Sequence, residues 1–457
     1  MPTYQKRITF LLCSLISALL LLSCNTPTTI TETAPATRQI DSLFIDEVWS
    51  GHPVGFALLT KPPHQFVAYY DSNRVMTVAQ RQLGEKVWEK KKLPETIGWD
   101  SHNYISMALD SKGHVHVSGN MHVDSLVYFQ ASKPYDAASL ERKEQLIGNL
   151  ESRATYPKFF SSAEGDLVFT YRDGGSGNGN QIYNRYNPET QAWSRLLDEP
   201  LVDGKGERNA YLHGPVPGPD GYYHLIWVWR ETPDAETNHD ISYARSKNLA
   251  HWEQSDGSPQ PLPITLENCE IIDPVPVEQG MINGNTKIGF DQNDQLVVTY
   301  HKFGPEGNTQ VFNARREDEG WKIYQATDWD FRWDFGGRGS LNSRVSVFPV
   351  VVEQGQLTQQ YWIDTLGLQK FLLDEENLST VKALPVDKGY PEDLEKVRST
   401  FPGMRVNLET EQTDEGDIYT LRWETLTRNR DLPREGDLPD ASPLMLYHVS
   451  QDENQTF

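Results

Sequence analysis

Two histidines stand at the two ends of a predicted β-hairpin in the first third of the chain. His102 opens and His122 closes this hairpin, in the segment SHNYISMALDSKGHVHVSGNMH, with a tight turn at Asp110–Gly113 between the strands. Because a hairpin returns the chain to the edge from which it left, we expect both imidazoles at one edge of a sheet. Imidazole accepts or donates a proton near neutral pH, so the pair is suited to acid–base chemistry.

The same layout occurs twice more, with Tyr and Arg in place of His. Tyr156 begins and Arg172 ends one segment, and Tyr211 begins and Arg230 ends the next. If the hairpins pack side by side around an axis, these groups lie together at the opening of one cleft. A site with His, Tyr and Arg suits acid–base chemistry on an anionic substrate. A phenol near a cationic group can have its pKa lowered enough to carry a proton. The predicted catalytic set is His102, His122, Tyr156, Arg172 and Tyr211, and the predicted substrate-binding residues are Tyr171, Arg230 and Trp333.

A repeated pattern of strands and turns predicts the architecture that positions these groups. Similar segments end in strands that carry tryptophan, at Trp88, Trp193, Trp252 and Trp321. We count seven such units, which begin near Val54, His102, Tyr156, Tyr211, Thr286, Val345 and Asn407. Four strands per unit at this spacing indicates an all-β protein, a β-propeller formed by residues 39–457 as a single domain, with seven blades by this count and six or eight as alternatives. We expect the strand at Ile40–Val48 to complete the last blade beside Leu444–Val449.

Two loops are expected to wall the cleft. They are the glycine-rich Asp173–Asn180 and the aromatic Thr327–Gly339. The first loop resembles a phosphate-binding loop but lacks the Lys-Ser/Thr ending and the following helix, so nucleotide binding is rejected. Helical signals are limited to short connections at Ala137–Leu150 and Pro391–Ser399.

The N-terminus has the pattern of an export signal. Lys6 and Arg7 precede an apolar run that ends in Leu21-Leu22-Ser23-Cys24, so residues 1–23 are predicted to be a lipoprotein signal peptide and Cys24 the lipidated residue. Residues 24–38 are predicted to be a flexible tether. The protein would then be a monomer in the cell envelope, held to the outer membrane or cell surface only by its lipid. An ordinary secretory signal or an uncleaved anchor is the alternative.

Composition limits the partners. The formal net charge of −22 should repel nucleic acid and, on average, any polyanion, so a polyanionic substrate requires a locally basic cleft. Cys269 is the one cysteine outside the N-terminal segment, so no disulfide is expected within the fold. Cys269 and four histidines form the one plausible metal set, with buried, satisfied histidines as the alternative; these histidines are His213, His224, His239 and His301.

With these residues in view, the chain resembles the bacterial ulvan lyases built on a seven-bladed propeller, within the wider group of BNR-repeat proteins. The resemblance covers roughly residues 54–362 and is carried by the hairpin of His102 and His122, TYPKFF, FTYRDGGSGNGN, HLIWVWRETPD, NHDISYARS, TKIGFD, TYHKF and ATDWDFRWDF. It implies eliminative cleavage of an acidic, sulfated algal polysaccharide at uronic acid residues, with the five predicted catalytic residues at the family's catalytic positions. It also implies a structural zinc, for which His213, His224, Cys269 and His301 are the ligands that this sequence offers.

The chemistry of these groups agrees with that implication. Elimination removes the proton on C5 of a uronate, which becomes acidic when a cation such as Arg172 and a neighbouring His neutralise the carboxylate. A His or Tyr takes that proton and a Tyr or His protonates the departing oxygen, with no cofactor needed for the step. Which residue is base and which is acid, and whether the uronate is glucuronate or iduronate, stay open. Two alternatives remain, a glycoside hydrolase of the sialidase-like propeller type and a non-catalytic glycan-binding lipoprotein.

Overall fold

A computed structural model describes residues 40–449, which are organised almost entirely in β-strands. The described part of the chain contains no α-helix and three short 3-10 helices, η1 (Ala137–Ser139), η2 (Ala235–Thr237) and η3 (Glu392–Glu395). No helix within residues 40–449 is long and apolar enough to cross a membrane. The predicted signal peptide, Cys24 and the tether lie outside the described residues. The described residues 40–449 belong to one compact unit.

The strands form seven antiparallel sheets, and the first four lie within residues 57–273. The first contains β2 (Ala57–Lys61), β3 (His64–Tyr70), β4 (Val75–Gln82) and β5 (Glu89–Thr96). The second contains β6 (Ile105–Leu109), β7 (Val115–Gly119), β9 (Tyr128–Ala131) and β10 (Leu140–Arg142). The third contains β8 (His122–Asp124), β11 (Ala154–Ser161), β12 (Leu167–Asp173), β13 (Asn180–Asn187), β14 (Ala192–Arg195) and β15 (Val202–Asp203). The fourth contains β16 (Asn209–Pro217), β17 (Tyr223–Arg230), β18 (Asn238–Ser246), β19 (Trp252–Glu253) and β20 (Glu270–Asp273).

The remaining three sheets follow in chain order, and the last one also takes the first strand. The fifth contains β21 (Lys287–Phe290), β22 (Leu296–Phe303), β23 (Thr309–Glu317) and β24 (Gly320–Gln325). The sixth contains β25 (Val345–Glu353), β26 (Gln356–Ile363), β27 (Gly367–Leu373) and β28 (Thr380–Leu384). The seventh contains β29 (Met404–Gln412), β30 (Ile418–Leu426), β31 (Ser442–Val449) and β1 (Ile40–Val48). The predicted pairing of the first strand with the last is confirmed, because Ile40 lies opposite Val449 and Val48 opposite Ser442.

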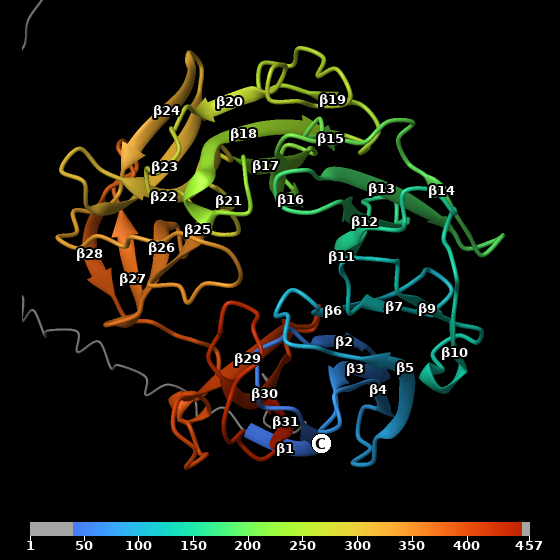
Figure 1. Ribbon diagram of the computed structural model, residues 1–457. Coiled ribbons are helices and arrows are strands. Elements are labelled where there is room, and N and C mark those ends of the chain that lie inside the picture. The colour runs from blue at the N-terminus through green and yellow to red at the C-terminus, as the bar shows by residue number, and fades with distance from the viewer. Residues whose placement is uncertain (1–39, 450–457) are drawn as a thin grey trace, which may run out of the picture. The chain divides into compact units, whose positions relative to one another are not determined.

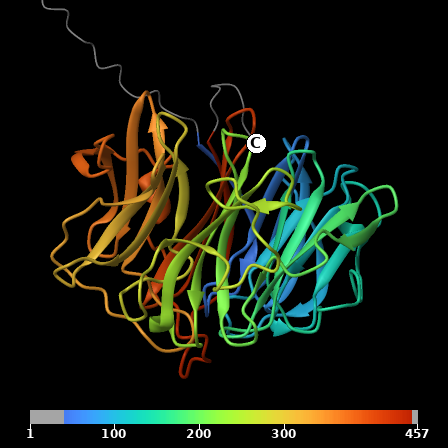
Figure 2. The same cartoon turned by 90° about the horizontal axis from the view of Figure 1, so that it is seen from above.

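The sheets of the described residues follow one another around a common centre, as Figure 1 shows, and Figure 2 gives the same sheets in a view turned by 90°. The first strands of successive sheets contact each other, as β2 does β6, β6 does β11, and β21 does β25. Each sheet starts close to one of the predicted repeat units. The prediction of an all-β chain is therefore confirmed. Five of the seven sheets have the four strands predicted for each unit, whereas the third sheet has six strands and the fourth has five.

Local sequence explains why the hairpin turns form where they do. Asp110 accepts hydrogen bonds through Oδ1 from the backbone N–H groups of Lys112 and His114, at 2.9 Å each. Asp291 makes the same two contacts with the N–H groups of Asn293 and Gln295. A short carboxylate that binds the backbone two and four residues on stabilises a turn without further partners.

The tryptophans predicted to close the repeat units pack at the outer strands. Trp193, Trp252 and Trp321 lie in the fourth strand of their sheets, and Trp88 directly precedes β5. Trp88 and Trp252 are buried, and Trp193 packs against Tyr186 of its own sheet and against Tyr128 of the preceding sheet. The core therefore lies between the faces of neighbouring sheets, as expected for radially packed sheets.

Candidate functional site: a polar cavity with paired histidines and tyrosines

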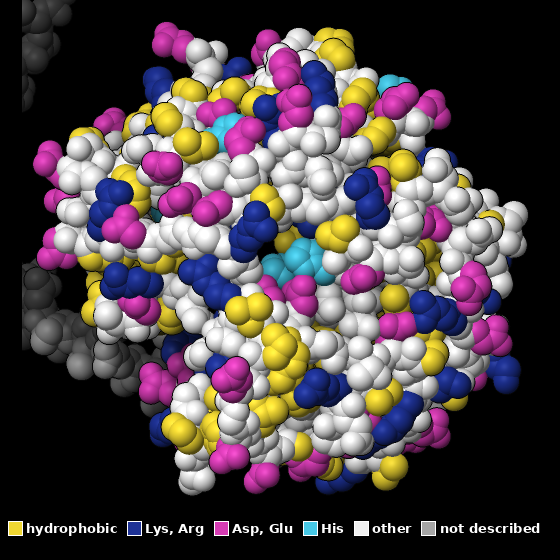
Figure 3. All heavy atoms as spheres, viewed as in Figure 1, with side chains coloured by type: hydrophobic (Ala, Val, Ile, Leu, Met, Phe, Trp, Pro, Cys, Tyr) yellow, Lys and Arg dark blue, Asp and Glu magenta, His cyan; other side chains and the backbone are white. Residues whose placement is uncertain are grey.

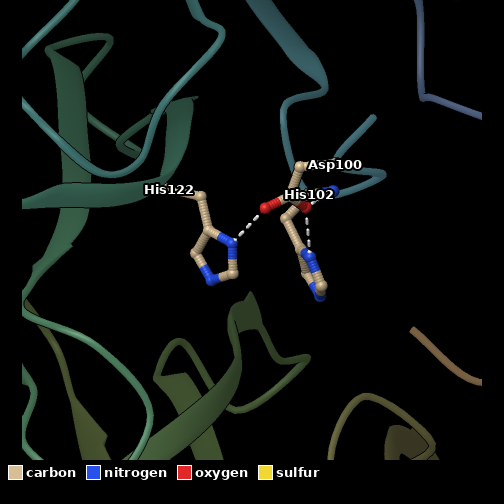
Figure 4. A group of neighbouring side chains, drawn as sticks. All are labelled: Asp100, His102 and His122. Carbon is tan, nitrogen blue, oxygen red and sulfur yellow. Dashed lines mark hydrogen bonds and ion pairs between the residues drawn. The ribbon is translucent and has the colours of Figure 1, made fainter. Parts of the chain in front are cut away.

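The two histidines of the first hairpin are held by one carboxylate. Asp100 Oδ1 accepts a hydrogen bond from His102 Nδ1 at 2.6 Å, and Asp100 Oδ2 accepts one from His122 Nδ1 at 2.6 Å (Figure 4). The centroids of the two rings are 4.5 Å apart. Because both rings present Nδ1 to the carboxylate, their Nε2 atoms are the ones left to act on a ligand.

The strand that carries Tyr156 is bent so that its phenol meets this pair. β11 is paired with β8, which begins at His122, and its register with β12 shifts between Thr155 and Lys158. Tyr156 lies in this bulge with φ of 57°, in the left-handed region that residues other than glycine rarely adopt. Its ring centroid is 5.8 Å from that of His102 and 6.0 Å from that of His122. The bulge thus turns the side chain from the sheet toward the histidines, at a cost of about 1–3 kcal/mol.

Arg172 and Tyr211 complete the cluster from the next two hairpins. The guanidinium carbon of Arg172 lies 4.7 Å from the ring centroid of Tyr156 and 5.5 Å from that of Tyr211. The ring centroids of Tyr156 and Tyr211 are 6.1 Å apart. The hydroxyls of Tyr211 and Ser176 form a 2.5 Å hydrogen bond. The five residues predicted to be catalytic therefore do lie together, and the glycine-rich loop contributes Ser176.

A cavity of about 540 Å³ opens beside this cluster. Its walls include His102, His122, Tyr156, Tyr211 and Arg230. Figure 3 shows histidine side chains in a hollow at the centre of the face, with Lys and Arg side chains beside it. A cavity of this volume is typical of small-ligand sites.

Burial and charge affect the two tyrosines in opposite directions. Burial alone raises the pKa of Tyr211, but the positive charges of Arg172 and Arg230, together with the hydrogen bond to Ser176, outweigh it and lower the Tyr211 pKa below its ordinary value of 10.0. For Tyr156, burial and the neighbouring Tyr211 outweigh Arg172 and raise the pKa. Two titratable groups whose pKa values are pushed apart are suited to opposite roles in proton transfer.

Arg172 is predicted to contact the substrate, but the structure places it outside the cavity lining. Its side chain is 1% exposed, lies behind the two tyrosine rings and does not line the cavity. Its Nε donates to the Gly174 carbonyl at 2.9 Å, and neither Nη atom has a hydrogen-bond partner among the described residues. The geometry therefore favours an effect of its charge on Tyr211. Arg230 does line the cavity and is fixed by the carbonyls of Thr232, Pro233 and Asp234.

Two carboxylates that the sequence did not single out organise the site. Burial opposes ionisation of Asp100, but the hydrogen bonds from His102 and His122 outweigh it and lower the Asp100 pKa far below its ordinary value. Asp431 accepts from the Ser101 N–H at 3.0 Å, the Ser101 hydroxyl at 2.8 Å and the Ser340 N–H at 2.7 Å. Its Oδ2 is 3.5 Å from His102 Nδ1, so it joins the His102 segment to a loop that is distant in sequence.

Two predicted substrate-binding residues lie in the core, away from the cavity. Tyr171 is fully buried, packs on Phe169 and accepts a hydrogen bond from Arg195 at 3.2 Å. Side chains of consecutive strand residues point to opposite faces, so Tyr171 points away from the cluster that Arg172 joins. Trp333 is buried against His301 and Phe335. Of the loop Thr327–Gly339, the residues that line the cavity are Arg338 and Gly339.

The four predicted zinc ligands do not converge. His224 uses both ring nitrogens within the protein, with Tyr243 at 2.8 Å and Asp220 at 3.0 Å. Cys269 lies beside Ser242 and His301 stacks on Trp333, while burial and then Lys287 and Lys158 lower the pKa of His213 to about 4. Within residues 40–449 the one group of three potential ligand residues is Asp100, His102 and His122. The residues present do not fit the zinc site that the resemblance implied.

The fold and the cavity together define a class, all-β proteins in which separate sheets bring acid–base side chains to one polar cavity. A model described as BNR repeat-containing family member matches residues 64–329, more than half of the chain, and the chain belongs to that family.

Curated relatives and solved structures extend this result. The chain is 26% identical over 238 residues to the short isoform of ulvan lyase from Alteromonas sp. (strain LOR), a match that covers 46% of this chain and 44% of that protein. It is 50% identical over 63 residues to the long isoform from Glaciecola sp. (strain KUL10), which is 14% of this chain and 6% of that protein. The matches thus span less than half the length of these curated relatives.

The fold is also similar to those of solved lyase structures. The structure of polysaccharide lyase Uly1 superposes with a TM-score of 0.58 at 14% identity and covers 90% of this chain and 94% of that one. An ulvan lyase of family PL25, bound to -[GlcA(1-4)Rha3S]-, superposes with a TM-score of 0.55 at 12% identity and covers 85% and 93%. The predicted resemblance to ulvan lyases is confirmed, and these structures support the fold.

Proposed function

We propose that the chain is a polysaccharide lyase that cleaves an ulvan-type polymer of sulfated rhamnose and uronate by β-elimination. The observation that carries this proposal is the pair Tyr156 and Tyr211, with pKa values displaced in opposite directions beside the two histidines on Asp100. The similarity to ulvan lyases supports the substrate class. The seven sheets are inferred to be the blades of a seven-bladed propeller, with the cavity at its centre.

The residues can be given roles from this geometry. Tyr211, ionised with the help of Arg172 and Arg230, takes the proton from C5 of the uronate. The electron pair of the C5–H bond forms the C4–C5 double bond, and the C4–O bond breaks. The departing oxygen receives a proton from Tyr156 or from an imidazole stabilised by Asp100. Arg230, at the cavity wall, neutralises the uronate carboxylate and so makes the C5 proton acidic.

The carboxylates weigh against a glycoside hydrolase. Such an enzyme needs one carboxyl group that stays protonated until it donates to the leaving oxygen. Burial opposes the ionisation of Asp100 and Asp431, yet their hydrogen bonds lower both pKa values far below the ordinary value. Both groups are therefore ionised at neutral pH and neither is suited to be that acid.

A spectroscopic assay tests the proposal. Ulvan treated with the protein should gain the ultraviolet absorbance of a 4,5-unsaturated uronate, and His122→Ala should lose it. Reducing ends without this absorbance would indicate hydrolysis instead, and binding without products would indicate a glycan-binding protein. Attachment to the outer membrane or cell surface through Cys24 remains part of the proposal, and labelling with a radioactive fatty acid, with Cys24→Ser as control, tests it.

A further inference from the structure

The carboxylate of Asp100 orders two imidazoles in the way that proteins order the ligands of a metal ion. A metal-binding histidine commonly donates one ring N–H to a carboxylate, which leaves the lone pair of its other nitrogen for the ion. Asp100 accepts from Nδ1 of both His102 and His122 at 2.6 Å. Figure 4 shows the second nitrogen of each ring on the side that points away from Asp100. Because both rings line the cavity, two Nε2 lone pairs are available to one ligand there.

The two rings are close enough to share one ion. Their centroids are 4.5 Å apart, with an angle of 37° between the ring planes. Potential ligand atoms of Asp100, His102 and His122 all lie within 4.8 Å of one another. Bonds of about 2.0–2.1 Å to Zn²⁺ place two nitrogens about 3–4 Å apart, a spacing that small changes in the side-chain torsion angles provide here. The two histidine side chains are 26% and 23% exposed, so an ion with its water ligands can reach them.

A second carboxylate between two histidines lacks these properties. Asp110 Oδ2 is 3.0 Å from His114 Nδ1 and 3.6 Å from His116 Nε2. The side chains of both histidines are buried, and His116 Nδ1 is 2.7 Å from the hydroxyl of Tyr128. This cluster is therefore shielded from an ion in solution, and it offers a matched control for the pair on Asp100.

Charge and ligand type together select the ion. Burial opposes the ionisation of Asp100 and Asp431, but hydrogen bonds outweigh it and lower both pKa values, so both carboxylates are charged at neutral pH. Asp431 Oδ2 is 3.5 Å from His102 Nδ1, so the negative charge lies beside the rings. Three arginines that line the cavity oppose a cation, and the affinity therefore has to come from the nitrogen ligands. Imidazole suits Zn²⁺ and Cu²⁺, whereas Ca²⁺ and Mg²⁺ prefer oxygen.

We propose that His102 and His122 bind one Zn²⁺ or Cu²⁺ ion through their Nε2 atoms, with Asp100 as the hydrogen-bond partner of both ligands and water in the remaining positions. Nε2 is also the atom through which either imidazole acts on the polymer, so the bound ion closes the site and inhibits cleavage. The metal binding does not depend on the proposed function, whereas the inhibition rests on it. The site shares no residue with the zinc set that the resemblance implied.

Calorimetric titration of the metal-free protein with Zn²⁺ tests the binding. Asp100→Asn should weaken it by about 10–100-fold, and loss of a ligand in His102→Ala or His122→Ala should weaken it by at least as much. Two control variants should bind as the wild-type protein does: His114→Ala, which alters the buried cluster, and Cys269→Ser, which removes the free thiol. Titration with Ca²⁺ should show no difference between the wild-type protein and His122→Ala, because carboxylates elsewhere on the chain would hold that ion.

The visible absorbance of bound Co²⁺ gives a second readout, which should be present in the wild-type protein and lost in the two histidine variants. Circular dichroism shows whether these variants are folded. Zn²⁺ should also inhibit polymer cleavage with an inhibition constant that matches its Kd, and chelation with EDTA should restore the rate.

Two results would overturn the metal site, namely no Zn²⁺ binding by the wild-type protein and wild-type affinity in both histidine variants. Binding at these residues without inhibition would overturn the closure of the site. If the protein cleaves no polymer, the proposed function fails, and the calorimetric and absorbance measurements still decide whether the histidines bind the ion.

Discussion

Asp100 and His122 are joined by a 2.6 Å hydrogen bond although they lie on opposite sides of a complete hairpin. The same carboxylate binds His102 at 2.6 Å, so one residue fixes the orientation of both rings. A carboxylate that accepts from Nδ1 sets the tautomer of a neutral imidazole and stabilises the imidazolium. The hairpin brings the two histidines to one edge, and Asp100 gives them a common orientation.

Replacing Asp100 should therefore disable both histidines while leaving them in the chain. We expect Asp100→Asn to lower kcat on ulvan by about 10²-fold, within the range for loss of a positioned acid or base. Initial rates of ultraviolet absorbance change measure it, with Asp166→Asn, at an exposed ion pair, as the control. A wild-type kcat in Asp100→Asn would mean that the carboxylate is not needed for the step.

The charge of Arg172 should control the pH dependence through Tyr211. Tyr211 acts as a base when it is ionised, so kcat/KM should rise as the pH rises through the Tyr211 pKa. Arg172→Met removes a charge that favours the phenolate, so this rising limb should move to higher pH. Absorbance titration of tyrosinate provides a second measurement, in which Tyr211→Phe should remove the earliest-ionising tyrosine. If the rising limb of the kcat/KM profile lies at the same pH in Arg172→Met as in the wild-type protein, a group other than Tyr211 is the base.

The site residues that can be predicted from the sequence are those that a repeated local pattern places together. Contacts between residues far apart in the sequence cannot be predicted in this way. Tyr156 and Tyr211 stand at matching hairpin positions, so the repeat alone placed them together. Asp431 contacts Ser101 across 330 positions, and no local pattern connects such residues. The sequence predicts both Tyr171 and Arg172 as site residues, yet consecutive strand residues face opposite sides, so only one of the two can belong to the site.

Asp431 should make stability fall in acid. Burial raises its pKa, but hydrogen bonds from His52 and Ser101 outweigh burial, so its pKa in the folded state is lower than in the unfolded state. A carboxyl with a lowered folded-state pKa stabilises the protein fully above its unfolded-state pKa of about 3.9, and this contribution is lost as the pH falls below that value.

Asp431→Asn should therefore reduce the free energy of unfolding at pH 7 by about 1–3 kcal/mol and weaken its dependence on pH in acid. Urea denaturation at several pH values measures both effects. Wild-type stability at pH 7 in the variant would contradict the role of Asp431 in joining the two loops.

Trp333 should affect stability more than substrate binding. Its ring is buried between His301 and Phe335, with centroids at 5.4 and 4.9 Å, and does not reach the cavity. Trp333→Ala should lower the free energy of unfolding by about 3–5 kcal/mol, because it leaves a large hole in the core. Denaturant unfolding measures this loss, and KM measured at a temperature where the variant is folded should change by less than about twofold. A large rise in KM with unchanged stability would restore the predicted role of Trp333 as a residue that binds substrate.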